Sequence, residues 1–565
     1  MLIYDFEVFK YDWMISWLDT ETRKMNTIHN DRDAFIKFYD ENKYRIWIGY
    51  NSRGYDQWIA KGILAGFDPY KISDWIINRD RKGWEFSKLL HKFPILNYDT
   101  MIGFRSLKEL ESFMGDDIKE SNVRFDVDRP LTHSEIEETK EYNIHDVWET
   151  FKVFIETKDE FESHYNMIKE FGLPLTYINK TKAQLSAIIL GASKKDRDDE
   201  FEISFPETLS LGKYKYIKDH YINWANNVKD YELVELQTEI GGVMHTLAIG
   251  GLHSAIPNYI GDGEYILADV SSYYPALMIE YDLLSRNVFD KSKFKQIRDE
   301  RLEMKANRDP KEYPRKIVLN STYGAMKDKY NNLYDPLQAN NVCIYGQLLL
   351  VDLIDKLEDL VDIIQSNTDG VLFKLRNPED RETAIEICEE WSKRTRMNLE
   401  YESYKRIIQK DVNNYIMVMD NGKIKRKGSY VKSLSPLDND LPIVNKAIVD
   451  YFTKNISPVD TILNSKRMID FQKITKVSHK YEYAVYNGET MNERVFRTFA
   501  TIGDGGTLYK QHKEKEIGSI DKTAGTPENC VIVNEDITEM ETPYLLDRQW
   551  YIDLAEKRIK DFLGE

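Results

Sequence analysis

The chain has 565 residues, of which 42% are hydrophobic and 31% charged, a composition that excludes a disordered protein. This length is enough for about three or four domains, and no uncharged apolar stretch is long enough to cross a membrane. The net charge of −17 excludes a uniformly basic surface, and the scattered Cys343, Cys388 and Cys530 indicate neither a disulfide framework nor a zinc site. A reducing compartment fits this cysteine usage best.

The N-terminal 160 residues mix short strands with helical patterns. Leu2–Phe9 and Tyr44–Tyr50 are predicted strands, and an acidic amphipathic helix over Ser134–Thr157 closes the region. A mixed segment follows to about residue 262. Near its end, the paired glycines within Ile249–His253 indicate a hinge or a close approach of the backbone.

Acidic residues recur in three short strings of the N-terminal region. Four acids suffice to hold two metal ions for 3′→5′ nuclease chemistry, with a tyrosine to orient the attacking water. The candidates are Asp5, Glu7, Asp56, Asp146 and Tyr142. Because Asp5 and Glu7 alternate along a strand, we expect the strand end to twist or bend before both reach one ion. His145 adjoins Asp146, but the spacing favours Tyr142 for the role beside the water.

Three further strings follow in order in the second half of the chain. They are Asp269-Val-Ser-Ser-Tyr-Tyr274-Pro275, Lys316-Ile-Val-Leu-Asn320-Ser-Thr-Tyr323-Gly and Asn367-Thr-Asp369-Gly370. A five-residue match to the second string arises by chance in about one chain in several thousand, at about 5% usage per residue. Coincidence is therefore a poor account of all three.

The first and third strings each place a carboxylate at the end of an apolar strand. Tyr265–Ala268 delivers Asp269, and a hairpin of Ile363–Gln365 with Val371–Lys374 exposes Asp369. Mg²⁺ prefers such oxygen ligands, and two ions between the carboxylates could activate a primer 3′ hydroxyl and stabilise departing pyrophosphate. Taken alone, Asp-Gly here is a favoured hairpin turn, which is compatible with an exposed acid.

A helical hairpin lies between these two strands. Residues 291–307 form a charged helix, Pro310 and Pro314 break it, and a second helix starts near Arg315. Lys316, Asn320 and Tyr323 of the second string share one face of that helix. This face offers a cation for a triphosphate and an aromatic plane for a base. Arg301 and Lys305 extend the phosphate clamp in one interpretation and are ordinary solvated ion pairs in the other.

Tyr274 lies beside Pro275, five residues after Asp269. A ring at this position would collide with a ribose 2′-hydroxyl and so select deoxynucleotides; core packing is the alternative. Basic residues cluster over 291–329 and 404–432, so we expect a cationic groove on an acidic body. The remaining 120 residues are mixed and end in an amphipathic helix over Leu545–Leu563.

Together the three strings resemble motifs A, B and C of the family B (α-like) DNA polymerases, most closely those of phage enzymes. The resemblance implies that Asp269, Val270 and Asp369 hold the metals and that Tyr274 is a steric gate. It further implies that the incoming nucleotide is bound by a set of side chains from the helical hairpin. These are Arg301, Lys305, Lys316, Asn320 and Tyr323.

This sequence departs from the family pattern in the third string. Asn367 stands where an aspartate is usual, and Gly370 replaces a common serine. Because the metal-holding role falls on Asp369, we expect activity to survive, with an effect on rate or metal preference. The family's primer-grip lysine is left open among Lys410, Lys425 and Lys427.

The N-terminal acids resemble the Exo I, II and III motifs of the family's proofreading domain. Ser106 and Leu107 begin a string similar to its motif that contacts single-stranded DNA, with Ser106 and Asn51 as the expected contacts. The implied fold is an α+β multidomain chain, an RNase H-like exonuclease beside a right-hand polymerase. The expected ranges are exonuclease 1–160, linking region 161–262, palm 263–290 with motif A, fingers 291–335 with motif B, palm 336–445 with motif C and thumb 446–565.

The resemblance implies a DNA-dependent DNA polymerase with 3′→5′ proofreading in phage-type replication, in the cytoplasm, or the host cytoplasm if viral. Expected ligands are primer-template DNA, dNTPs and two Mg²⁺ ions per site, with Mn²⁺ as a substitute. Only 47 residues separate Asp269 from Lys316 and 53 separate Lys316 from Asp369, which leaves no room for protein-priming inserts. We therefore expect no terminal protein, no membrane, and a helicase, clamp-like or single-strand-binding partner.

Three alternatives remain open. The chain could be an exonuclease whose polymerase palm has decayed, with Asn367 as an early sign. It could also be a replisome component that binds primer-template without catalysis. A reverse transcriptase is disfavoured because its hairpin would carry paired aspartates, which Asn367-Thr-Asp369 does not supply.

Overall fold

The computed structural model describes residues 1–516 and 518–565 as a mixed α/β chain. It divides into two compact units, each built from segments that are distant in the sequence. Unit 1 contains Met1–Lys180, Leu434–Val444 and Val459–Asp553. Unit 2 contains Thr181–Ser433, Asn445–Pro458 and Leu554–Glu565.

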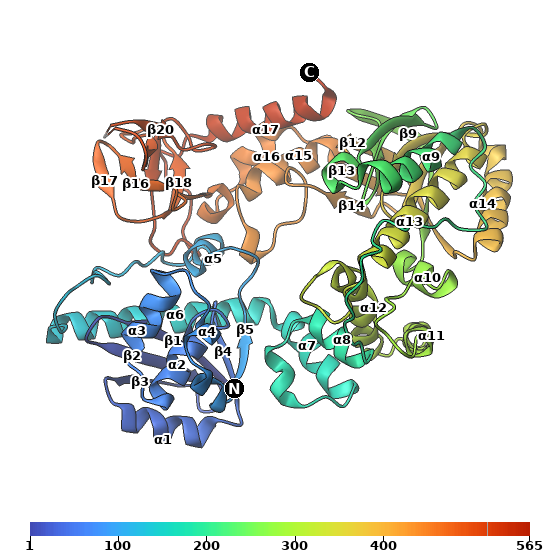
Figure 1. Cartoon of the computed structure of the whole chain (residues 1–565). Coiled ribbons are helices and arrows are strands. Elements are labelled where there is room, and N and C mark those ends of the chain that lie inside the picture. The colour runs from blue at the N-terminus through green and yellow to red at the C-terminus, as the bar shows by residue number, and fades with distance from the viewer. Residues whose placement is uncertain (517) are drawn as a thin grey trace. The chain divides into compact units, whose positions relative to one another are not determined.

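Unit 1 begins with a five-stranded mixed sheet in the order β3-β2-β1-β4-β5, shown in blue in Figure 1. Its strands are β1 (Leu2–Val8), β2 (Trp13–Asp19), β3 (Lys24–His29), β4 (Ile46–Gly49) and β5 (Leu96–Asp99). β1 pairs antiparallel with β2 and parallel with β4, so it is the central strand. The two strands predicted in this region are confirmed at β1 and β4.

The helices of this part are α1 (Arg32–Asn42), α2 (Asp56–Ala65), α3 (Pro69–Ile77), α4 (Gly83–Phe86), α5 (Leu107–Met114), α6 (His133–Glu156) and α7 (Lys158–Glu170). Three of them, α1, α3 and α6, begin after a residue whose side chain caps the first turn. The predicted acidic helix is confirmed as α6. Thr132 is its N-cap and forms a reciprocal capping box with Glu135, which satisfies free N–H groups of the first turn and so fixes where the helix begins.

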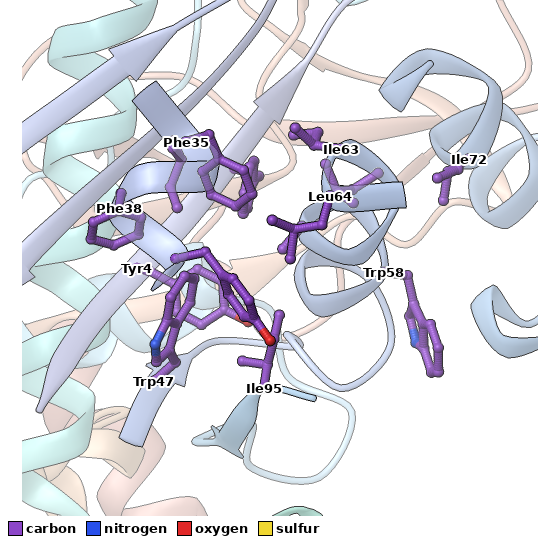
Figure 2. Packing of buried hydrophobic residues seen from close by; sticks show 14 of the residues in the cluster. Tyr4, Phe35, Phe38, Trp47, Trp58, Ile63, Leu64, Ile72 and Ile95 are labelled. Atoms are coloured by element: carbon purple, nitrogen blue, oxygen red, sulfur yellow. The ribbon is translucent and has the colours of Figure 1, made fainter. Parts of the chain in front are cut away.

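Alternation along β1 separates an apolar face from a polar one. Leu2, Tyr4, Phe6 and Val8 all belong to the buried core against α1 and α2. Figure 2 shows the rings of Tyr4, Phe35, Phe38 and Trp47 gathered there, and the Tyr4 and Trp47 ring centroids lie 5.3 Å apart. The odd-numbered residues of β1 therefore point to the opposite face, where α6 packs.

Unit 1 also contains two small antiparallel sheets from the C-terminal part of the chain, drawn in orange and red in Figure 1. Their strands are β15 (Lys473–Lys476), β16 (Tyr481–Tyr486), β17 (Glu489–Met491), β18 (Val495–Ala500), β19 (Leu508–His512), β20 (Ile520–Lys522) and β21 (Cys530–Ile532). Arg497 on β18 is fully buried and donates to the carbonyls of Ser112 and Asp116. The expected 446–565 segment is thus shared between the two units.

Unit 2 is organised by one antiparallel sheet in the order β14-β13-β12-β9-β11-β10-β8-β7-β6. The strands are β6 (Leu236–Ile240), β7 (Val243–Ala248), β8 (Gly251–Ala255), β9 (Tyr259–Val270), β10 (Val361–Ser366), β11 (Gly370–Leu375), β12 (Leu399–Asp411), β13 (Asn414–Met419) and β14 (Ile424–Lys427). The predicted hairpin is confirmed as β10–β11. The strand that carries Asp269 is longer than the sequence pattern indicated.

Unit 2 contains the helices α8 (Lys182–Ile189), α9 (Lys215–Asn223), α10 (Tyr273–Glu280), α11 (Ser292–Ala306), α12 (Glu312–Lys327), α13 (Pro336–Leu357) and α14 (Arg381–Thr395). They include the predicted helical hairpin, as α11 and α12, with shifted ends. The expected start near Arg315 is wrong, because α12 begins at Glu312 and includes Pro314. Proline is tolerated there since the first turn of a helix needs no N–H donor.

The remaining helices are α15 (Pro442–Lys454), α16 (Pro458–Asn464) and α17 (Arg548–Leu563). The last of these confirms the predicted C-terminal helix with a start three residues later, at Arg548 rather than Leu545. In the part of the chain that the structure describes, none of the helices combines the length and apolar character needed to cross a membrane.

Candidate functional site

Strand pairing in unit 2 brings Asp269 and Asp369 together. In the register of β9 with β11, Gly370 lies opposite Asp269. The Val270 N–H donates to the Asp369 carbonyl over 2.7 Å, so the two acidic residues lie on adjacent backbones. A side chain at Gly370 would place its Cβ 2.6 Å from Asp269 Oδ1, which explains glycine at this position.

The two carboxylates lie close enough for the charge of Asp369 to affect the pKa of Asp269. Burial, and then the nearby Asp369, raise the pKa of Asp269 to about 7. Burial also raises the pKa of Asp369, while Lys425 and Lys427 oppose that rise. Adjacent oxygens that resist ionisation together form a set of hard donors that a divalent ion would satisfy. The residues present therefore fit Mg²⁺.

Asn367 has a structural role in the turn that carries Asp369. Its Oδ1 accepts from the N–H groups of Asp369 and Gly370, over 3.1 and 2.8 Å. Aspartate could accept the same two bonds, so the amide preserves the turn while it removes one charge.

The first and second strings meet through their tyrosines. Tyr274 at the start of α10 and Tyr323 on α12 have ring centroids 4.5 Å apart in an edge-to-face arrangement. The Tyr274 hydroxyl donates to the Gly250 carbonyl over 2.9 Å, which fixes the ring to the turn between β7 and β8. Lys316 and Asn320 lie on the same face of α12 as Tyr323, with Asn320 exposed.

The two candidate clamp cations are engaged within the protein. Arg301 is buried, donates to Ser272 Oγ over 2.6 Å and pairs with Glu312 over 3.2 Å. Lys305 lies 3.7 Å from Glu400. Several other basic residues of the expected cationic groove are also paired with acids, so the local excess of positive charge is smaller than the sequence suggests. These include Lys291, Arg298, Arg315, Arg406 and Lys425.

A third acidic position was missed by the sequence analysis. Glu400 on β12 lies opposite Asp269 in the β9–β12 register, and Glu402 follows on the same face. Lys425 reaches Glu402 over 2.8 Å. Alternating Glu400-Tyr-Glu402 in a strand pattern is a signal for one acidic face, but only strand pairing shows that it borders Asp269.

Of the three lysines left open, two lie near the catalytic candidates. Lys425 and Lys427 both influence the pKa of Asp369. Lys410 instead lies over the Tyr430 ring, 5.2 Å from its centroid.

Unit 1 contains a cleft of ≈ 780 Å³ beside the central strand, β1, of its five-stranded sheet. All four predicted acids line it together with Asn51 and Asp99. The acids come from three elements, since Asp5 and Glu7 lie on β1, Asp56 begins α2 and Asp146 lies on α6. The fold therefore gathers side chains that are up to 141 residues apart in the sequence.

Asp5, Glu7 and Asp146 offer ligand oxygens that all lie within 4.8 Å of one another. The expected bend of β1 is wrong, because residues two apart in a strand already share a face. Asn143 on α6 donates to Asp5 Oδ2 over 2.7 Å and orients it.

Burial raises the pKa of all four acids of the cleft, with further contributions from neighbouring carboxylates. For Asp56, which is 3% exposed, the pKa rises to about 7 despite a hydrogen bond from the Phe6 N–H. Buried carboxylates that repel one another are stabilised by a bound cation. This donor set also fits divalent ions.

A lysine that the sequence analysis missed neutralises part of this charge. Lys108 on α5 reaches Asp146 Oδ1 over 2.5 Å and Glu111 Oε1 over 3.1 Å, and it lies over the Tyr142 ring. Burial raises the pKa of Tyr142, so its phenol keeps the proton that would orient a water. Lys108 directly follows Ser106-Leu107, yet nothing in its spacing reveals a partner 38 residues away.

The two residues expected to contact single-stranded DNA, Asn51 and Ser106, and the motif residue Leu107 lie in different surroundings. Asn51 lines the cleft with a left-handed φ of 54°. Ser106 occupies the N-cap position of α5, but its buried Oγ has no hydrogen-bond partner in the described part of the chain. Leu107 begins α5 but does not line the cleft.

Comparisons with known proteins give similarities of two kinds, one in sequence and one in structure. No protein-family model matches the chain. A segment of 187 residues is 26% identical to DNA polymerase 1 of Saccharolobus solfataricus; it covers 32% of this chain and 20% of that relative's length. The family B DNA polymerase of Pyrobaculum calidifontis matches with a TM-score of 0.42 and 13% identity, over 100% of this chain and 78% of that one. By sequence, one segment of this chain is thus similar to part of a DNA polymerase.

Proposed function

We propose that the chain is a DNA-dependent DNA polymerase that extends a primer 3′ end. The single observation that carries the proposal is the β9–β11 register, which makes Asp269 and Asp369 neighbours although 100 positions separate them in the sequence. Two such carboxylates in a strand-end setting are what two-metal nucleotidyl transfer requires.

In this proposal, the side chains divide the work of nucleotide binding. When bound, two Mg²⁺ ions would supply activation of the 3′ hydroxyl and charge stabilisation at the departing pyrophosphate. Asp269, Asp369 and the Val270 carbonyl would hold them. Lys316 and Asn320 would meet the triphosphate, with Arg301 and Lys305 released from their acidic partners or held to position the helical hairpin.

Tyr274 and Tyr323 would form the floor under the deoxyribose and base. Because Tyr274 is tethered to Gly250 and packed against Tyr323, its ring has little freedom to yield to a 2′-hydroxyl. A rigid ring discriminates better than a mobile one, which supports the steric-gate role.

We further propose that residues 1–160, which belong to unit 1, form the proofreading 3′→5′ exonuclease. The cleft lined by four acids supports this, as does the mixed order of the sheet with β1 at its centre. Asp5, Glu7, Asp56 and Asp146 would hold the metal ions, Tyr142 would orient the water, and Asn51 and Ser106 would contact the single strand.

The short spacing of the three strings supports a phage-type enzyme that lacks protein-priming inserts and uses ordinary primers. In this proposal, the palm comprises residues 263–290 and 336–445, the fingers 291–335 and the thumb 446–565. The same reasoning favours a helicase, clamp-like or single-strand-binding partner that opens duplex ahead of a modestly processive chain. Long rolling-circle products from the purified chain alone would contradict this last point.

A primer-template assay with a labelled primer tests both activities at once. With Mg²⁺ and dNTPs we expect extension, and without dNTPs we expect shortening. Asp369→Ala should abolish only extension. Extension that survives in this variant would refute the polymerase site, and shortening without extension in the wild type would favour a nuclease with a decayed palm. If Mg²⁺ changes neither product, the chain is a binding component of the replisome.

A further inference from the structure

A second group of metal-ligating side chains lies beside the acids of unit 1. Glu111 on α5 and His145 and Asp146 on α6 offer one ligand atom each, and these atoms lie within 4.8 Å of one another. The group differs from the acids of the cleft in one respect, because it contains a histidine nitrogen. Glu111 and His145 have no part in the proposed nuclease chemistry.

Two atoms of this group lack hydrogen-bond partners in the described part of the chain. Glu111 is fully buried, and its Oε2 accepts no hydrogen bond. His145 Nε2 is also without a hydrogen bond, and it lies 3.6 Å from that oxygen, beyond hydrogen-bond reach. The two atoms form only a long ion pair, so the buried carboxylate oxygen still lacks a hydrogen bond, and a cation bound to both atoms would satisfy them.

The separation of the two atoms suits a metal ion between them. Zinc–nitrogen and zinc–oxygen bonds of about 2.1 Å at a tetrahedral angle hold their donor atoms about 3.4 Å apart. The observed 3.6 Å is close to that value, whereas a direct hydrogen bond would require the atoms to approach.

Lys108 already neutralises the other side of the group. Its ammonium contacts Glu111 Oε1 and Asp146 Oδ1, but neither of the two atoms that lack a hydrogen bond. Lys108 therefore offsets part of the negative charge but leaves Glu111 Oε2 and His145 Nε2 without a hydrogen bond. A divalent ion would compete with it for both carboxylates.

We propose that Glu111, His145 and Asp146 form a binding site for a borderline transition-metal ion of the Zn²⁺ class. A nitrogen donor with two carboxylates favours such ions, whereas Mg²⁺ prefers an all-oxygen set. The site stands independently of DNA synthesis. Because Asp146 also belongs to the cleft, a bound Zn²⁺ would draw this carboxylate away from the proposed nuclease metals.

Isothermal titration of Zn²⁺ into the chelator-treated full chain tests the site. We expect the tightest Zn²⁺ site of the wild type to weaken at least about tenfold in His145→Ala. His133→Ala is the matched control, since His133 is an exposed histidine at the start of the same helix and should not matter. Asp5→Asn should retain the site, which separates it from the cleft.

A second variant keeps the test decisive if His145→Ala unfolds. Lys108→Met removes the competing cation and should tighten Zn²⁺ binding by about tenfold or more. An unchanged or weaker affinity in this variant would overturn the proposal. So would a wild type that binds no Zn²⁺ at about 100 μM, or an H145A chain that binds like the wild type. These readouts use binding alone, so they do not depend on whether the chain makes DNA.

Discussion

The two acidic sites of this chain are assembled in different ways. In unit 2, hydrogen-bonded strand neighbours bring Asp269 and Asp369 together, and each acid remains partly exposed. In unit 1, acids from a strand and two helices line one cleft, Lys108 pairs with Asp146, and Glu7, Asp56 and Asp146 are buried. Strand register fixes the first pair almost independently of side chains, whereas the second group depends on how the whole unit packs.

This difference should appear in how the sites respond to protons and to substitution. A partly exposed pair can be screened by water, while buried acids depend on a cation to offset desolvation. We therefore expect the unit 1 site to affect stability as well as chemistry, and the unit 2 site to affect chemistry mainly.

The largest expected effect is a double separation of activities. Asp5→Asn should lower the degradation rate of a single-stranded primer by about 10³-fold or more, because a metal ligand is lost. Extension should stay within about twofold. Asp269→Asn should instead lower extension by a similar factor and leave degradation within about twofold. Loss of both activities in either variant, in a folded chain, would contradict two independent sites.

Asp56→Asn should stabilise the metal-free protein. The pKa of Asp56 is about 7 in the folded state and near 3.8 otherwise, so the unfolded chain releases its proton first as pH rises. Stability from this group is therefore lost between pH 3.8 and about 7, and asparagine removes the loss while it keeps the acceptor for the Phe6 N–H. Urea unfolding at pH 7.5 should show a gain of about 2–4 kcal/mol. A less stable D56N chain would exclude this charge balance.

Tyr274→Ala should reduce sugar selection in unit 2 alone. Without the ring, a ribose 2′-hydroxyl would find space, and incorporation of ribonucleotides should rise about 10- to 100-fold relative to deoxynucleotides. The ratio of kcat/KM values for the two nucleotides measures this. Tyr274→Phe is the matched control, since it keeps the ring but loses the bond to Gly250. An unchanged ratio in Y274A would assign the ring to core packing.

Proton competition should lower both activities below neutral pH. The pKa values of Asp269 and Asp56 are both about 7, so protonation below that pH opposes metal binding. At subsaturating Mg²⁺ each rate should fall about tenfold per pH unit, and excess Mg²⁺ should move the fall to lower pH. Rates that are flat between about pH 5.5 and 7.5 would be inconsistent with these pKa values.

Asn367 should give the smallest effect. Asn367→Ala removes two hydrogen bonds in the turn that carries Asp369, at a cost of about 1–2 kcal/mol, and should lower extension several-fold. Asn367→Asp restores both acceptors and should extend primers at least as well as the wild type. Degradation should be unchanged in both. If N367A and N367D behaved alike, the turn would not depend on this side chain.

The local sequence pattern predicted most of the strands and helices that hold the site residues. It could not predict the contacts that depend on strand pairing and helix packing. The β10–β11 hairpin, β1 and α6 follow from alternation, turn residues and a capping box, which are short-range effects. Glu400 and Lys108 could not be found in this way. Their importance comes from a strand register and from helix packing, which the residues within ten positions of them do not encode. The bounds of α12 were misjudged because Pro314 was taken as a breaker rather than a first-turn residue.

The division of the chain has a consequence for any attempt to separate the two units. The polypeptide passes from one to the other after Lys180, Ser433, Val444, Pro458 and Asp553. A fragment that ends at residue 160 would lack Arg497, whose guanidinium satisfies two buried carbonyls of unit 1. Such a fragment should express as an aggregating or partly folded species. Because five junctions link the units, neither can be exchanged by a fusion at a single junction. Both must be expressed and engineered within one continuous chain.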